Sequence, residues 1–136
     1  MIKMKNLKSS LTIVVSSFVL VTMAEARSVA FSDEAICKAT MSLVMNQKPT
    51  IIKARNVGNE VVVSYKRAND GKTFEYKCLI KQSENKVIWA AKLDNAWGRW
   101  RDGQYDAVIT YKVENMNLIV DEAGHSKKFK ASELGH

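Results

Sequence analysis

The segment NAWGRWRDGQYD, Asn95 to Asp106, concentrates residues that are well suited to bind a partner. It holds two tryptophans and two arginines within twelve residues. Such residues dominate binding hot spots, because an indole buries a large area and a guanidinium makes several directed hydrogen bonds. The same side chains can stack on a sugar ring while holding a phosphate or carboxylate. The segment therefore predicts a contact surface built from Trp97, Arg99 and Arg101.

A structural role for the same residues competes with this interpretation. Asp102-Gly103 is a strong signal for a two-residue hairpin turn. Counting outward from that turn places Trp100 opposite Tyr105 and Arg99 opposite Asp106. An aromatic pair and an opposite-charge pair of this kind each stabilise a sheet by roughly 0.2–1 kcal/mol. A hairpin would thus account for these four side chains without any partner.

The expected hairpin leaves Trp97 and Arg101 on its other face. They either form a binding hot spot, or Trp97 folds back over the sheet edge and Arg101 is solvated. A second candidate surface is the basic segment SKKFK near the C-terminus, which favours an anionic partner. Its lysines are Lys127, Lys128 and Lys130.

The spacing of nucleophiles and bases does not favour catalysis. The two histidines are His125, expected in a loop, and His136, the last residue, and no serine-hydrolase, zinc-protease or phosphate-loop motif occurs. A glycosidase needs two carboxyl groups at a set separation, and Asp94, Asp102 and Asp106 lie close together in sequence. However, the hairpin uses Asp102 in its turn and Asp106 in its ion pair. We expect no catalytic residue, no metal site and no cofactor.

The first 26 residues have the pattern of a secretory signal peptide. Three lysines precede an apolar run from Leu11 to Met23, and Ala24 and Ala26 suit a signal peptidase. The run is shorter than the roughly 20 apolar residues that span a bilayer. We therefore expect residues 1–26 to be removed and residues 27–136 to form one domain, periplasmic or secreted, with no transmembrane segment.

The charge of the exported chain limits its partners. The whole chain has a net charge of +7, and removal of the leader leaves +5. This balance favours an extracytoplasmic acidic protein or an anionic envelope component, although it also suits a domain that is merely kept soluble. Nucleic acid is a poor candidate, because an exported protein seldom meets it.

Cys37 and Cys78 are the two cysteines of the chain. Two cysteines in an exported domain usually form one disulfide. Closing a loop of this length would stabilise the fold by about 4 kcal/mol. A metal pair or a redox site is a weaker interpretation, because no CxxC motif occurs and no histidine lies nearby.

The pattern of apolar residues predicts the elements that hold these side chains. Ser32 is a candidate N-cap for a helix that ends near Asn46, before Pro49. Later segments alternate with a period of two and are separated by short turns, which is typical of antiparallel strands. The segment SKKFKASEL fits either an edge strand or a short helix. We predict an α+β domain, with one N-terminal helix packed on an antiparallel meander sheet of about five or six strands and joined to it by the disulfide.

Several pieces of the chain together resemble a recurring type of small exported bacterial single-domain protein. These pieces are CKATMSLVM, YKC, VIWA, GRWR and DAVITY. The resemblance implies one domain, with no activity and no site residues.

The functional hypothesis is a non-catalytic, disulfide-stabilised exported domain. Its partner is a protein, as for a small inhibitor or immunity-type protein, or an anionic envelope component. Two alternatives stay open. One is a structural envelope component without a dedicated binding face, and the other is a small hydrolase of wall polymer.

Overall fold

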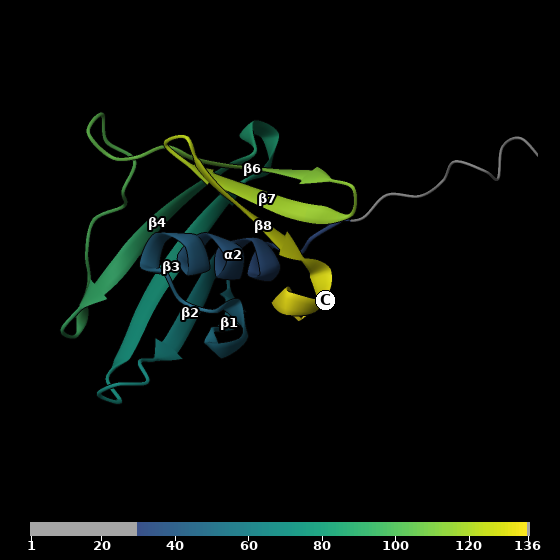
Figure 1. The fold of residues 1–136 in the computed structure, drawn as a ribbon. Helices are drawn as coiled ribbons and strands as arrows, with labels where there is room; N and C mark the ends of the chain where they lie inside the picture. The colour runs from purple at the N-terminus through teal and green to yellow at the C-terminus, as the bar shows by residue number, and fades with distance from the viewer. Residues whose placement is uncertain (1–29, 136) are drawn as a thin grey trace, which may run out of the picture.

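The computed structural model describes residues 30–135, in which an α-helix precedes eight strands (Figure 1). Helix α2 spans Asp33–Met45. The Ser32 side chain accepts a hydrogen bond from the Ala35 N–H (3.1 Å) and caps the first turn. The helix ends at Asn46, whose backbone is left-handed (φ 53°). These bounds confirm the predicted helix, whereas the expected leader lies outside the described residues.

The strands form one antiparallel sheet in the order β1-β2-β3-β4-β6-β7-β8, with β5 paired to β4. The α+β class and the helix-to-sheet disulfide are confirmed, but the sheet has more strands than predicted. The strands are β1 Lys53–Val57, β2 Glu60–Lys66, β3 Thr73–Lys81, β4 Lys86–Leu93, β5 Ala96–Trp97, β6 Ile109–Glu114, β7 Asn117–Glu122 and β8 His125–Lys130.

Two strands explain the difference in number. Strand β5 has two residues, too few to show an alternating pattern. Strand β8 lies at the edge of the sheet, and Phe129 is its one buried residue, so charged side chains hide its alternation. The C-terminal segment then continues into a 3-10 turn at Ala131–Leu134. The segment SKKFKASEL therefore contains an edge strand followed by a short helix. His125, expected in a loop, is the first residue of that strand.

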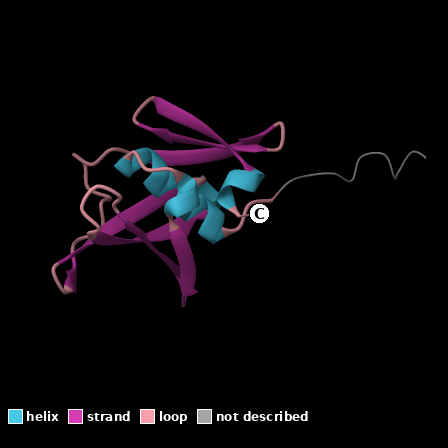
Figure 2. Ribbon diagram, turned by 60° about the horizontal axis from the view of Figure 1, so that its bottom comes forward, coloured by secondary structure: helices cyan, strands magenta, loops and turns pink. Residues whose placement is uncertain are grey.

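The sheet bends sharply between β4 and β6, which share two residue pairs, Lys86–Thr110 and Val87–Ile109. Strands β1–β4 form one half of the curled sheet and β6–β8 the other. Helix α2 lies between the halves (Figures 1 and 2) and contacts β1, β2, β3, β7 and β8. The inner face of the curl therefore supplies the core. Its fully buried sheet residues include Val61, Val63, Ile109, Leu118, Val120 and Phe129.

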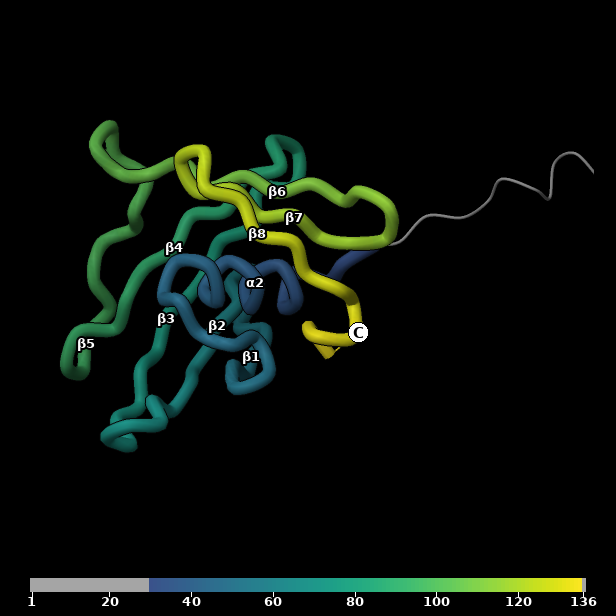
Figure 3. The backbone as a smooth tube through the Cα atoms, viewed as in Figure 1, coloured from purple at the N-terminus to yellow at the C-terminus, as the bar shows by residue number. Residues whose placement is uncertain are grey.

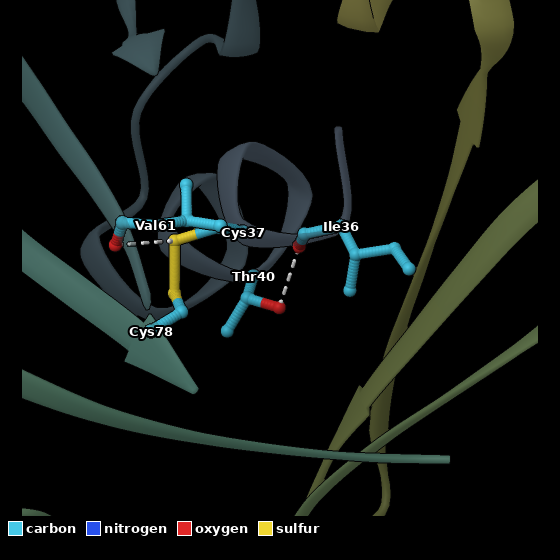
Figure 4. The surroundings of a disulfide bond; sticks show 5 residues. All are labelled: Ile36, Cys37, Thr40, Val61 and Cys78. Carbon is cyan, nitrogen blue, oxygen red and sulfur yellow. Dashed lines mark hydrogen bonds between the residues drawn. A yellow bond between two sulfur atoms is a disulfide. The ribbon is translucent and has the colours of Figure 1, made fainter. Parts of the chain in front are cut away.

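The disulfide joins the centre of α2 to the inner face of β3 (Figure 4). Cys37 and Cys78 are both fully buried, and their Cα atoms are 5.9 Å apart. Beside them, the buried Thr40 hydroxyl donates to the Ile36 carbonyl (2.8 Å), so burying it leaves no unsatisfied donor. The Sγ of Cys37 lies 4.0 Å from the Val61 carbonyl oxygen. Because a disulfide sulfur carries no proton, that contact is packing.

Removal of the disulfide should destabilise the domain strongly. The bond closes a loop with a sequence separation of 41, so the Cys37→Ala/Cys78→Ala variant should lose about 4 kcal/mol of unfolding free energy. Urea denaturation followed by circular dichroism measures this change. A loss below about 1 kcal/mol would show that α2 and β3 hold together by packing alone.

Candidate functional site

The tryptophan-rich segment follows the free edge of β4. A two-residue turn at Asp94-Asn95 joins β4 to β5, and Asp94 has a left-handed backbone (φ 57°). After β5 the chain stays beside β4 (Figure 3). The Gly98 N–H donates to the Ala91 carbonyl and the Arg101 N–H to the Trp89 carbonyl, both at 2.8 Å. The segment thus covers the part of the β4 edge that β6 leaves unpaired.

The hairpin predicted at Asp102-Gly103 is wrong. No strand forms between β5 and β6 in the described chain, and Tyr105, expected opposite Trp100, is 93% exposed. The physical reason is the direction of the chain along β4. Residues 96–101 run antiparallel to β4, and β6 continues in the same direction along the same edge, with Ile109 opposite Val87. A hairpin at Asp102-Gly103 would reverse the chain and prevent β6 from pairing there.

Trp97 and Trp100 lie over the outer face of the sheet. The Lys77 ammonium sits between them, 4.9 Å from the Trp97 ring centroid and 4.7 Å from that of Trp100. Glu60 pairs with the same ammonium at 3.6 Å. Trp97 therefore folds back over the sheet, as the structural interpretation expected. This cover explains why three apolar residues that point outward are at most 5% exposed: Val62, Ile88 and Ala90.

Arg101 lies on the opposite, inner face and is not simply solvated. Its guanidinium carbon is 5.0 Å from the centre of the Trp89 ring. Trp89 pairs with Cys78 across β3 and β4, so its side chain points to the inner face. The Nε of Arg101 is buried without a hydrogen-bond partner among the described residues. The structure thus does not bring Trp97 and Arg101 together on one surface.

An ion pair fixes the loop that follows. Arg99 donates to both carboxylate oxygens of Asp106, from Nη1 to Oδ2 at 2.8 Å and from Nη2 to Oδ1 at 2.9 Å. The Gly103 N–H also donates to Oδ2 (2.8 Å). The hydrogen bonds from Arg99 and then Gly103 lower the pKa of Asp106 to about 2. The predicted Arg99–Asp106 pair is confirmed, but it closes a loop and not a hairpin.

Tyr105 stands at the exposed part of this loop, which we call the 98–108 loop. Among the described residues it is the one aromatic side chain that is exposed. Val108, 53% exposed, follows it, and its carbonyl accepts the Ala123 N–H from the β7–β8 turn (3.2 Å). The predicted hairpin paired Tyr105 with Trp100, so the sequence did not identify Tyr105 as an exposed aromatic residue. The signal was its setting, DGQYD, in which every other residue is small or polar.

The C-terminal lysines also divide between two faces. Lys127 points to the inner side, where its Nζ is 5.2 Å from the Phe129 ring centroid. Lys128 and Lys130 point to the outer side, by the alternation of β8. All three lysines are exposed. The basic segment therefore does not present one continuous surface.

The carboxylates considered for hydrolysis do not gather either. Asp106 is held in the loop, and Asp102 is exposed beyond it. Asp94 instead shares a cleft of about 430 Å³ with Glu75, at the point where β3 and β4 part, and Glu75 pairs with Lys92 (3.3 Å). Residues 30–135 contain no group of three histidine, cysteine, aspartate or glutamate side chains placed to hold a metal ion. No helix in the same residues is long and apolar enough to cross a membrane.

The position of Trp97 predicts a structural effect of its removal. Trp97→Ala should lower the free energy of unfolding by about 2 kcal/mol, because it uncovers outward-facing apolar residues and removes one of the two rings that contact the Lys77 ammonium. Tyr105→Ala is the matched control and should change stability by less than about 0.5 kcal/mol. Urea denaturation of both variants distinguishes the two roles. Equal stabilities would mean that Trp97 does not support the fold.

Arg99 and the Gly103 N–H hold the Asp106 carboxylate in an arrangement that we call the Asp106 clamp. The clamp should lower the pH at which Asp106 titrates. A lowered pKa means that the ionised carboxylate stabilises the clamp above the ordinary value of 3.8, and this stabilisation is lost as the pH falls toward 2. A carboxyl-detected NMR titration should give a midpoint near pH 2. Arg99→Gln should raise the midpoint toward 3.8. Asp70, whose pKa Arg67 lowers to about 2, is the internal control and should not move.

Comparison with known proteins gives no assignment. No family model matches the chain, and neither a curated protein nor a solved structure matches it. The described side chains must therefore carry the functional argument. Among them, the 98–108 loop is distinguished by an exposed aromatic residue on a backbone held by an ion pair.

Proposed function

We propose that this chain is an exported, non-catalytic domain that binds a protein partner through the 98–108 loop, with Tyr105 as the central contact. A small inhibitor or immunity-type protein works in this way, by placing a preformed loop against a site on its partner. The observation that carries the proposal is the 93% exposure of Tyr105 on a loop closed by the Asp106 clamp.

The geometry supports strong binding for an energetic reason. A tyrosine offers a large contact area and loses little conformational entropy, because its side chain has two rotatable bonds. Arg99, Gly103 and Asp106 already hold the loop closed before any partner arrives. A preorganised loop costs less ordering entropy on association than a mobile one.

The charges of the loop favour a protein over an anionic polymer. The loop contains two arginines and two aspartates, so it has no net charge. Arg99 is neutralised by Asp106, and the Arg101 guanidinium lies against Trp89. Tyr105 and Val108 instead offer apolar surface, which is typical of the centre of a protein interface.

Export is part of the same proposal. It is supported by the leader pattern of residues 1–26 and by the buried disulfide, because disulfides persist mainly in oxidising compartments. A partner would then be an extracytoplasmic protein.

Site-specific photo-crosslinking tests the proposed contact. A photoreactive phenylalanine analogue replaces Tyr105 in one chain and Met116 in a second. Met116 is a matched control, because it is 69% exposed on the turn between β6 and β7. We expect a crosslinked protein from position 105 that is missing from position 116. The same adducts from both positions, or none from either, would contradict the proposal.

The affinity of the purified partner then measures the contribution of Tyr105. Tyr105→Ala should weaken binding by about 2 kcal/mol or more, which is the usual loss at a hot spot. Met116→Ala should leave the affinity within a factor of about two. Titration calorimetry gives both values, and an unchanged affinity for Tyr105→Ala would place the contact elsewhere.

A further inference from the structure

The outer face of β1–β4 carries an unusual concentration of positive charge. The register of the four strands identifies the side chains that point away from α2. Two are acidic, and the face has a net charge of +5, whereas residues 30–135 together have +4. The rest of the described domain is therefore slightly acidic. The basic residues of this face are Lys53, Arg55, Lys66, Lys77, Lys81, Lys86 and Lys92.

Most of this charge is available to an external partner. The two acids are paired within the face, Glu60 with Lys77 at 3.6 Å and Glu75 with Lys92 at 3.3 Å. Five cations have no carboxylate within 4.0 Å among the described residues. They are Lys53, Arg55, Lys66, Lys81 and Lys86.

One cross-strand pair of lysines on this face should destabilise the domain when no partner is bound. Lys81 lies directly opposite Lys86 on the neighbouring strand, and like charges in this relation destabilise a sheet. Neither ammonium has a carboxylate within 4.0 Å among the described residues. An anionic surface placed against the face would relieve this repulsion.

The form of the face indicates the kind of anion. Its apolar members Val62, Ile88 and Ala90 are buried, and Val57 at the end of β1 is its one exposed large aliphatic side chain, so the face offers little for a protein hot spot or for insertion into a bilayer. The free cations occur on all four strands, and the face therefore extends in two dimensions. A linear polymer would meet one row of them, whereas an extended surface meets cations from several strands at once. Lysine, a hydrated point charge, suits such diffuse contact better than arginine.

We propose that the outer face of β1–β4 docks on an anionic lipid bilayer, by electrostatic attraction without insertion. This surface is separate from the 98–108 loop, and its argument does not rest on the proposed protein partner. Docking would hold the domain at a membrane while the loop contacts its partner.

Vesicle flotation with the processed chain tests the proposal. The protein is purified after export, and its N-terminus is determined by mass spectrometry. It should bind vesicles of phosphatidylcholine with phosphatidylglycerol and ignore vesicles of phosphatidylcholine alone. Binding should fall steeply with added salt. Inorganic phosphate at matched ionic strength should not compete, because a single free anion does not replace an extended surface.

Two charge-matched variants locate the binding face. The first removes four unpaired lysines of the outer face, by Lys53→Gln, Lys66→Gln, Lys81→Gln and Lys86→Gln. The control removes four lysines from the other half of the sheet, by Lys112→Gln, Lys127→Gln, Lys128→Gln and Lys130→Gln. The first should bind about six-hundredfold more weakly, because each of its four lysines contributes about a fivefold factor near an anionic surface. The control should stay close to the parent chain.

Each contrary outcome overturns a stated part of the proposal. Equal losses in both variants would show that net charge and not this face governs binding. No binding to anionic vesicles would exclude the lipid surface. The pairs Lys53→Gln/Lys66→Gln and Lys81→Gln/Lys86→Gln are also measured separately, with circular dichroism as a check of folding. Each pair should lose about half of the logarithmic effect, so the result does not depend on the fourfold variant.

Discussion

One edge of β4 has to satisfy its backbone hydrogen-bonding groups with two different segments. At its start β4 pairs with β6, and the sheet then bends away. The rest of the edge pairs with β5 and accepts hydrogen bonds from Gly98 and Arg101. An unpaired edge would lose these bonds and would also invite association with other chains. The path of the tryptophan-rich segment, and the place where the 98–108 loop begins, both follow from this requirement.

The same bend explains why β4 is buried on both faces. Val87 points into the core beneath α2, whereas Ile88 and Ala90 point outward beneath the tryptophans and Lys77. A strand covered on both sides reads as a continuous apolar run, and VIWAA is such a run. The inner cover is held by the disulfide and the outer cover by the edge segment. Within this one segment the tryptophans serve the fold, whereas the exposed Tyr105 is left for the proposed protein contact.

The sequence predicts local structure well and long-range structure poorly. The ends of α2 are readable from Ser32 and Asn46, because caps depend on neighbouring residues. The disulfide is also predictable, since Cys37 and Cys78 each fall on an apolar face. The hairpin at Asp102-Gly103 does not form because β6 continues along the same edge of β4 as β5, and this long-range pairing is not visible in a local turn signal. For the same reason Trp97 and Arg101 are expected on one face but lie on two.

The positions of the charged residues are likewise only partly predictable from the sequence. Alternation along each strand is visible in the sequence, so Lys53 and Arg55, or Lys77 and Lys81, can be assigned to one face of their own strand. Only the register shows that these faces coincide and that Lys81 meets Lys86. Folding into a curl places these cations on the outer side of the sheet and leaves the inner face to apolar packing. The charge of the domain therefore gathers on one surface as a consequence of burying its core, while the neutral 98–108 loop starts from the β4 edge that bounds this surface.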